Sequence, residues 1–182
     1  ALTVATSLDE SDDVLVQKLT SLGINWVRGS LDDVLSRFVL ATSDLADRDI
    51  CVRLTADNVL PDSNFIESLL EIRERVNAQY LSASDFNHPK LPVGLSAEVF
   101  TVRLLREVAK TSFSSDDLEH VTPAMRRITG PLELSGFPGM VSNTSVQRCT
   151  IDEHSDYIQV LDLFEEVLDP IVVGWNELLK AH

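Results

Sequence analysis

Two aspartates that each follow a run containing β-branched residues are the side chains best suited to chemistry in this sequence. Asp57 ends the segment RLTAD (53–57) and Asp152 ends the segment RCTID (148–152), so both have the pattern R-x-T-x-D. If both segments are strands of an open α/β sheet, ligands bind beyond their carboxyl ends. Two carboxylates on neighbouring strands, about 4.8 Å apart, would suit Mg²⁺, which takes one or two protein carboxylates and completes its shell with water and phosphate oxygens. An aspartate after a strand is also a common turn former, and the spacing leaves this alternative open.

Glu119 and His120 form a second candidate pair, shortly before Pro123. Because proline interrupts a helix, the segment 116–128 is predicted to bend there, and the bend could turn the imidazole toward a substrate. A purely structural histidine is the alternative. The spacing of Cys and His residues does not match a structural zinc site, and the Walker, G-x-G-x-x-G and G-x-S-x-G patterns are absent.

The charge of the chain excludes several classes of partner. Asp and Glu number 29 against 15 Lys and Arg, which gives a formal net charge of −14. Nucleic acid needs a basic stripe, so neither it nor an anionic membrane surface is an expected partner. No apolar run approaches the roughly 20 residues of a membrane span. Cys51 and Cys149 are predicted to be buried thiols in a reducing compartment rather than a disulfide, and the protein is therefore expected in the cytoplasm.

The elements that must position these residues alternate between strand and helix, which is typical of a mostly parallel sheet with helices on both faces. The signals S-x-x-E at Ser7 and S-x-x-D at Ser30 predict the first two helix starts, and Gly23 predicts a helix stop. Strands are predicted at 2–6, 24–28, 50–55, 79–83, 97–100 and 146–151. Helices are predicted between the first four strands, at 101–111 and 116–128, from Tyr157 to Leu168, and over 175–181.

The segment 131–144 is predicted to be an irregular excursion, because glycine and proline punctuate it. Its apolar residues pack either on a second copy of the chain or on their own domain, and the sequence leaves both outcomes open. A homodimer is the first of these outcomes. The apolar residues are Leu132, Leu134, Phe137, Met140 and Val141.

Six short stretches resemble the cytidylyltransferases of the spore-coat polysaccharide type, which are relatives of the enzymes that make CMP-sialic acid and CMP-ketodeoxyoctonate. The most specific match is VRGSLDDVLSRF at 27–38. The others are VATS at 4–7 with Asp12 and Asp13, VRLTADN at 52–58, LPVGL at 91–95 with EVF at 98–100, EHVTP at 119–123, and TID at 150–152 with Asp156 and Tyr157.

The resemblance implies a Rossmann-like nucleotide-diphospho-sugar transferase fold in one domain over residues 1–182. It also implies Mg²⁺-dependent transfer of CMP from CTP to a sugar or sugar acid, with release of pyrophosphate, in surface polysaccharide biosynthesis. The implied roles are Mg²⁺ binding for Asp57 and Asp152, a place beside the sugar for Gly94, Glu98, Glu119 and His120, and, for Arg28, Asp33 and Arg37, a place near the nucleotide or in fixing the loop that holds it.

The sequence departs from the family pattern at several positions. The family's first strand and its loop A-R-x-x-S-x-R-L-P-G-K have no counterpart here, so we expect a further strand–loop–helix unit of about 30 residues upstream. Val59, Val93 and Leu118 stand where the family commonly has a proline, a basic residue and an arginine. Two alternatives to an active enzyme of this family therefore stay open: a non-catalytic binding or assembly module, and a metal-dependent glycosyltransferase.

Overall fold

The computed structural model describes residues 1–60, 62–86, 94–111, 114–130, 149–165 and 174–175, and the single residues 132, 134, 137, 167 and 169. The chain forms two compact units: unit 1 comprises Ala1–Cys51 and Phe100–Gly130, and unit 2 comprises Val52–Val99 and Pro131–His182. That the whole chain acts as one domain stays a prediction.

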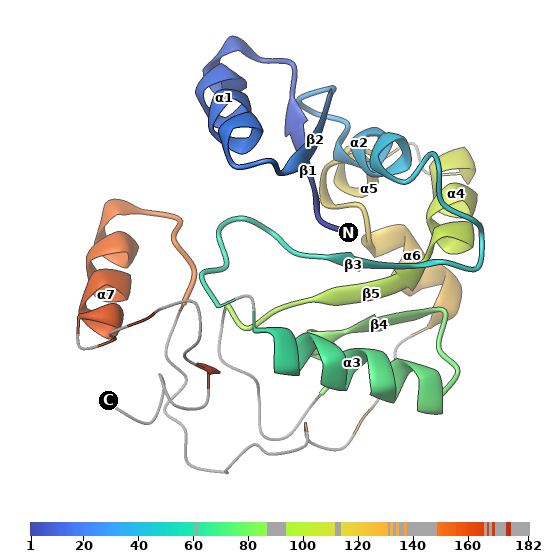
Figure 1. Ribbon diagram of the computed structural model, residues 1–182. Helices are drawn as coiled ribbons and strands as arrows, with labels where there is room; N and C mark the ends of the chain where they lie inside the picture. Colours follow the sequence, from blue (N-terminus) through green and yellow to red (C-terminus); the bar gives the residue numbers. More distant parts are fainter. Residues whose placement is uncertain are drawn as a thin grey trace. The chain divides into compact units, whose positions relative to one another are not determined.

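Unit 1 is built on two parallel strands that pair along their whole length, from Thr3 opposite Asn25 to Ser7 opposite Gly29. A parallel pair needs a crossover, and η1 and α1 supply it. The predicted strand–helix order of the first half is confirmed (Figure 1). The elements are β1 (Thr3–Ser7), η1 (Glu10–Asp12), α1 (Asp13–Ser21), β2 (Asn25–Gly29), α2 (Val34–Ala41), α4 (Val102–Thr111), α5 (Ser115–His120) and α6 (Pro123–Thr129).

Helix α2 occupies the centre of unit 1, where it contacts β1, β2, α4 and α5. It begins at Asp33, whose carboxylate accepts a hydrogen bond from the Ser36 N–H at 2.8 Å. The predicted signal marks the right place, but Asp33 rather than Ser30 is the cap; the Ser30 hydroxyl accepts from the Asp33 N–H. Leu35 is 2% exposed, so its side chain anchors the helix in the core. The contact between α2 and α5 brings the VRGSLDDVLSRF and EHVTP stretches together.

Helix α1 buries less of its apolar stripe than its spacing predicts. Leu19 is buried, whereas Val14, Leu15 and Leu22 are exposed. The helix contacts β2 and η1, and these contacts bury Leu19 but leave the other three side chains exposed. Gly23 ends the helix with φ at 68°, as predicted from its position.

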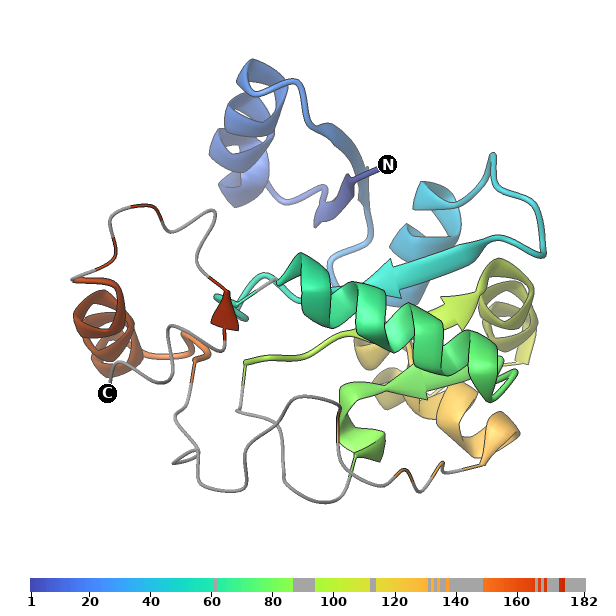
Figure 2. The same ribbon diagram turned by 60° about the horizontal axis from the view of Figure 1, so that its bottom comes forward.

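Unit 2 contains α3 (Ser63–Arg75), β4 (Tyr80–Ser82), η2 (Ala83–Asp85) and α7 (His154–Phe164). Strand β4 belongs to a three-stranded sheet of order β3-β5-β4, in which β3 is Ile50–Arg53 and β5 is Glu98–Thr101. Helix α3 packs against β4 (Figure 2).

Strand β5 runs antiparallel to β3. The Asp49 carbonyl accepts from the Val102 N–H at 2.9 Å, whereas Arg53, at the other end of β3, pairs with Glu98 at the start of β5. Strand β5 is also antiparallel to β4, because the Ala83 N–H, directly after β4, donates to the carbonyl of Ala97, directly before β5, at 3.0 Å. The α/β class is confirmed, with parallel pairing between β1 and β2 and with β5 running opposite to both of its neighbours.

The later part of unit 2 tests one of the predicted strands in part and corrects one helix. Of the strand predicted over 146–151, residues 146–148 lie outside the described residues, and Thr150 forms an antiparallel bridge with Asn58. Helix α7 ends at Phe164 instead of residue 168, and its predicted inward residues Tyr157, Ile158 and Leu161 are exposed. Of the helix predicted over 175–181, the structure describes only Trp175. Its side chain is buried, and its backbone N–H donates to the Asp62 carboxylate at 3.1 Å.

Part of the 131–144 excursion packs on its own unit. Phe137 is 5% exposed, and its ring centre lies 4.8 Å from that of Phe65 and 5.2 Å from that of Phe86. Leu134 pairs with Phe86 in a parallel bridge. Met140 and Val141 lie outside the described residues, so the homodimer stays a prediction.

We predict that Phe137→Ala lowers the free energy of unfolding by about 3 kcal/mol, because it removes a buried ring from this aromatic cluster. Urea denaturation followed by fluorescence measures the change. A variant of unchanged stability that sediments at half the wild-type mass would instead place Phe137 at an interface between copies.

Candidate functional site

The segments that carry the two candidate metal ligands lie side by side in unit 2. Asn58 and Thr150 form an antiparallel bridge. On one side of it the Asp57 carbonyl accepts from the Ile151 N–H at 2.9 Å, and on the other the Val59 N–H donates to the Cys149 carbonyl at 3.1 Å. Asp152 therefore directly follows a residue that is hydrogen-bonded to Asp57.

Both carboxylates are exposed at the end of this bridge. Asp57 lies in a tight turn closed by the Asn58 N–H and the Thr55 carbonyl at 3.2 Å, so the turn-forming alternative describes its backbone correctly. Asp152 precedes α7, where the Asp156 carboxylate accepts from the backbone N–H groups of Asp152 and Glu153, each at 3.0 Å. The Thr150 hydroxyl lies 3.5 Å from the Asp152 carboxylate.

The chemistry of this pair fits a hard divalent cation. Among the described residues no group of three or more His, Cys, Asp or Glu side chains gathers in one place. Mg²⁺ does not need such a group, because it takes only one or two protein carboxylates beside water and phosphate oxygens. Metal binding by Asp57 and Asp152 stays a prediction.

Gly94 lies directly against the same bridge. Its φ is 101°, and a Cβ built on it would lie 2.3 Å from the Cys149 carbonyl oxygen. Only glycine combines this backbone conformation with so close an approach. The LPVGL stretch is therefore tied to the TID stretch at Gly94, although 91–93 lie outside the described residues.

Glu98 joins three strands of the sheet. One carboxylate oxygen accepts from the Arg53 guanidinium at 2.6 Å and the other from the Tyr80 hydroxyl at 2.7 Å. The side chains of Arg53 and Glu98 are only 16% and 14% exposed, and a carboxylate this buried requires such partners. Glu98 therefore orients Arg53, the first residue of the R-x-T-x-D segment that ends at Asp57. Arg53 and Tyr80 are not among the site residues predicted from the sequence, although the arginine of the R-x-T-x-D pattern is a visible signal.

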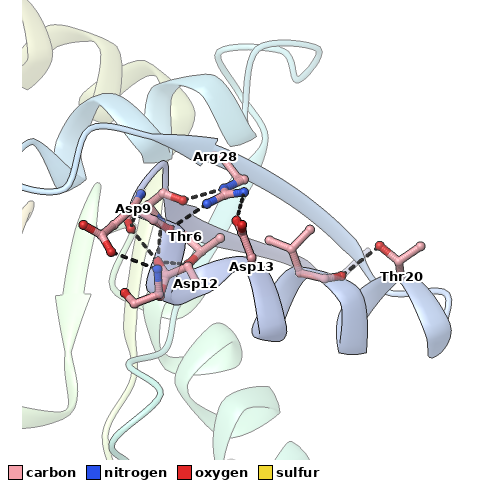
Figure 3. Close-up of polar contacts among 9 residues, drawn as sticks. Thr6, Asp9, Asp12, Asp13, Thr20 and Arg28 are labelled. Atoms are coloured by element: carbon pink, nitrogen blue, oxygen red, sulfur yellow. Dashed lines mark hydrogen bonds and ion pairs between the residues drawn. The ribbon is translucent and has the colours of Figure 1, made fainter.

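In unit 1, Arg28 fixes the loop that follows β1 (Figure 3). Its guanidinium donates to the carbonyls of Ser7 at 2.6 Å and Asp9 at 2.8 Å, and to the Asp13 carboxylate at 2.7 Å. These three bonds fix the loop after β1. That the loop holds the nucleotide, as expected for the loop that Arg28 fixes, stays a prediction.

Asp12 is the acceptor at the centre of the same loop. One carboxylate oxygen accepts from the Ser7 hydroxyl, the Ser7 N–H and the Thr6 hydroxyl at 2.5, 2.9 and 2.6 Å. These bonds, the Ser7 hydroxyl first, lower the pKa of Asp12 to about 2. The predicted capping box at Ser7 is wrong, because the Ser7 hydroxyl bonds to Asp12 and the Asp9 carboxylate caps η1.

Arg37, on α2, differs from Arg28 in its surroundings. Its aliphatic stem lies so close to Gly29 that a Cβ there would approach Cγ to 2.8 Å. Its Nε is buried and has no hydrogen-bond partner. Asp33 caps α2, as described above. Arg28 and Asp33 therefore both form hydrogen bonds within the protein that stabilise a loop or a helix end.

Glu119 and His120 are exposed in the last turn of α5. The His120 Nε2 lies 3.8 Å from the Asp116 carboxylate, one turn earlier. The predicted bend before Pro123 is confirmed, and Pro123 is the first residue of α6. The bend is formed by Val121, whose φ of 69° and ψ of −50° are strained for a β-branched residue. Strain of this kind costs about 1–3 kcal/mol.

The candidate residues thus fall into two groups. Arg28, Asp33, Arg37, Glu119 and His120 belong to unit 1, and Asp57, Gly94, Glu98 and Asp152 belong to unit 2. Cys51 and Cys149 are free thiols, as predicted, and burial raises the pKa of each to about 11, so neither is a ready nucleophile.

Comparison with known proteins identifies the class of protein. The chain belongs to the cytidylyltransferase family, whose sequence profile matches residues 1–170. It is 27% identical over 181 residues to the spore coat polysaccharide biosynthesis protein SpsF of Bacillus subtilis. This alignment covers 98% of the present chain and 72% of SpsF. It is 38% identical to an uncharacterized protein of Methanocaldococcus jannaschii over an alignment of 120 residues, which covers 66% of this chain.

The fold agrees with this family. A solved structure of a cytidylyltransferase from Leptospira borgpetersenii serovar Hardjo-bovis superimposes with a TM-score of 0.83 at 22% identity, over 98% of this chain and 74% of that chain. The chain spans about half of the Methanocaldococcus relative, 47% of its length. Within the part of the chain that the structure describes, no helix is long and apolar enough to cross a membrane.

We predict that Asp12→Asn removes a pH-dependent share of the stability. The folded pKa of Asp12 lies near 2 and below its ordinary 3.8, so its stabilisation is present above about pH 4 and is lost as the pH falls through about 2. The melting temperature of the wild type should therefore exceed that of the variant at pH 5–7, and the two should converge toward pH 2. Parallel curves from pH 7 to pH 2 would contradict this role.

We predict that Gly94→Ala destabilises the protein by well over 1 kcal/mol, because the new methyl group meets the Cys149 carbonyl in addition to the backbone strain at positive φ. Gly23→Ala is the matched control: its φ is 68°, but nothing lies within 4 Å of the new Cβ. Chemical denaturation of both variants measures the difference, and equal losses would show that the close contact at Cys149 costs nothing.

Proposed function

We propose that this protein transfers the cytidylyl group of CTP to a sugar or sugar acid, with Mg²⁺ and with release of pyrophosphate, in surface polysaccharide biosynthesis. The observation that supports this most directly is the antiparallel bridge that sets the Asp57 and Asp152 segments side by side. Family membership supports the reaction class, and the similarity to SpsF, a spore coat polysaccharide biosynthesis protein, supports the process.

In this reaction an acceptor oxygen attacks the α-phosphorus of CTP, and the bond from that phosphorus to pyrophosphate breaks in line. A bound Mg²⁺ would neutralise phosphate charge, and Asp57 and Asp152 are the residues that would hold it. The net charge of −14 repels a bare triphosphate, so local cations must offset that field. Arg37 is a candidate for this task, because its Nε has no protein partner.

The remaining residues position the substrates. Glu98 keeps Arg53 at the end of β3, and Gly94 lets its turn approach the Cys149–Ile151 segment. Glu119 and His120 are proposed to contact the acceptor from the end of α5, and Arg28 keeps the loop after β1 in one conformation.

The test is pyrophosphate release by the full-length protein with CTP, Mg²⁺ and a panel of acceptors that includes N-acetylneuraminate and 3-deoxy-D-manno-octulosonate. We expect Asp57→Asn and Asp152→Asn to lower kcat by at least about 100-fold, the usual effect of removing a group that stabilises transition-state charge. Asp162→Asn, an exposed carboxylate on α7 of the same unit, is the control and should keep full activity.

Three outcomes separate the alternatives. No pyrophosphate with any acceptor, together with no CTP binding by calorimetry, would support a binding or assembly module. Turnover of a nucleotide-sugar donor in place of CTP would support a glycosyltransferase. Full activity of both aspartate variants would remove the two residues from the proposed metal site.

A further inference from the structure

The turn between α5 and α6 has a backbone conformation that valine rarely adopts. The Thr122 N–H donates to the His120 carbonyl at 2.7 Å across Val121, whose φ is 69° and ψ is −50°. These values are close to those of the γ-turn with positive φ, which is rare and strained even for residues without a branched Cβ. Glycine would adopt it without steric cost.

Both sides of the turn are held firmly. The Val121 side chain is fully buried, and its N–H donates to the Asp117 carbonyl at 3.0 Å. The buried Asp117 carboxylate accepts two bonds from Arg127 of α6, at 2.7 and 2.6 Å. This charge-assisted contact lowers the pKa of Asp117 and ties α5 to α6. The strain is therefore sustained by the packing around the turn.

The residues directly before the strained position contribute little to the core. Glu119 and His120 are exposed, and the His120 imidazole lies 3.8 Å from the carboxylate of Asp116, which is also exposed. A γ-turn at residue 121 ends α5 abruptly at His120 and fixes the direction in which the last two side chains of the helix leave it. Strain held beside two exposed polar residues is typical of functional sites rather than of structural corners.

We propose that Val121 is a positioning residue, whose γ-turn holds Glu119 and His120 in the orientation in which they bind the acceptor sugar. This inference rests on the proposed function, since it assigns the acceptor to these two side chains. Val121 itself is buried and touches no substrate; it acts through the backbone of His120. Loss of the turn should then loosen acceptor binding and leave CTP binding as it was.

The experiment compares Val121→Gly with Val121→Ala. Both remove the buried isopropyl group, but alanine keeps the steric penalty at positive φ and glycine relieves it. We expect the glycine variant to melt at a temperature equal to or above that of the alanine variant. Without the isopropyl group that sustained the strain, alanine should leave the turn, whereas glycine should keep it. In the pyrophosphate assay we expect the KM for the acceptor of the alanine variant to be at least 10-fold above that of the glycine variant, with an unchanged KM for CTP in both.

A double-mutant cycle with His120→Ala tests the route of the effect. If the turn acts through His120, exchanging alanine for glycine at 121 should change the acceptor KM less than 2-fold once the imidazole is gone. Equal acceptor KM values for the two single variants, or a glycine variant that melts lower or fails to fold where the alanine variant folds, would overturn the positioning role. No turnover by the wild-type protein would instead reject the proposed function, and the positioning role with it.

Discussion

The short antiparallel contact between 57–59 and 149–151 is the interaction on which the candidate metal site depends. Its backbone hydrogen bonds, rather than any side-chain attraction, set the segments that carry Asp57 and Asp152 side by side, and two like charges supply no attraction of their own. Gly94 is part of the same arrangement, because its missing side chain leaves room for the Cys149 carbonyl. The site is therefore specified mainly by main-chain geometry, and the two carboxylates remain exposed at its end.

Hydrogen-bond networks around Asp12, Arg28 and Glu98 hold a loop and several strand ends in place. Asp12 collects the hydroxyl and N–H donors at the end of β1, and Arg28 joins the same loop to β2. Glu98 joins three strands through Arg53 and Tyr80. In each case one charged group satisfies several partners at once, which limits the conformations available to the loop or strand end beside it.

Much of the fold could be predicted from the sequence, because short strands and helices alternate with clear punctuation. Gly23 and Pro123 mark ends and bends that the structure confirms. Burial was harder to predict: Val14 and Tyr157 have helical spacing but are exposed, since spacing says which residues share a face and not what covers that face. For the candidate site, the sequence predicted which residues take part but not the contacts that those residues form. The pairing of Arg53 with Glu98 and the left-handed turn at Val121 depend on long-range packing that no local pattern encodes.

The bridge between Asn58 and Thr150 joins segments that are far apart along the chain. Closing so long a loop costs conformational entropy before the contact returns any stabilisation, and contacts of this kind form slowly. During synthesis from the amino terminus, the strands and helices of the first half can form before residue 150 leaves the ribosome. The second carboxylate would then arrive only after most of the scaffold exists, so a nascent or prematurely terminated chain would have the architecture without the paired acidic groups.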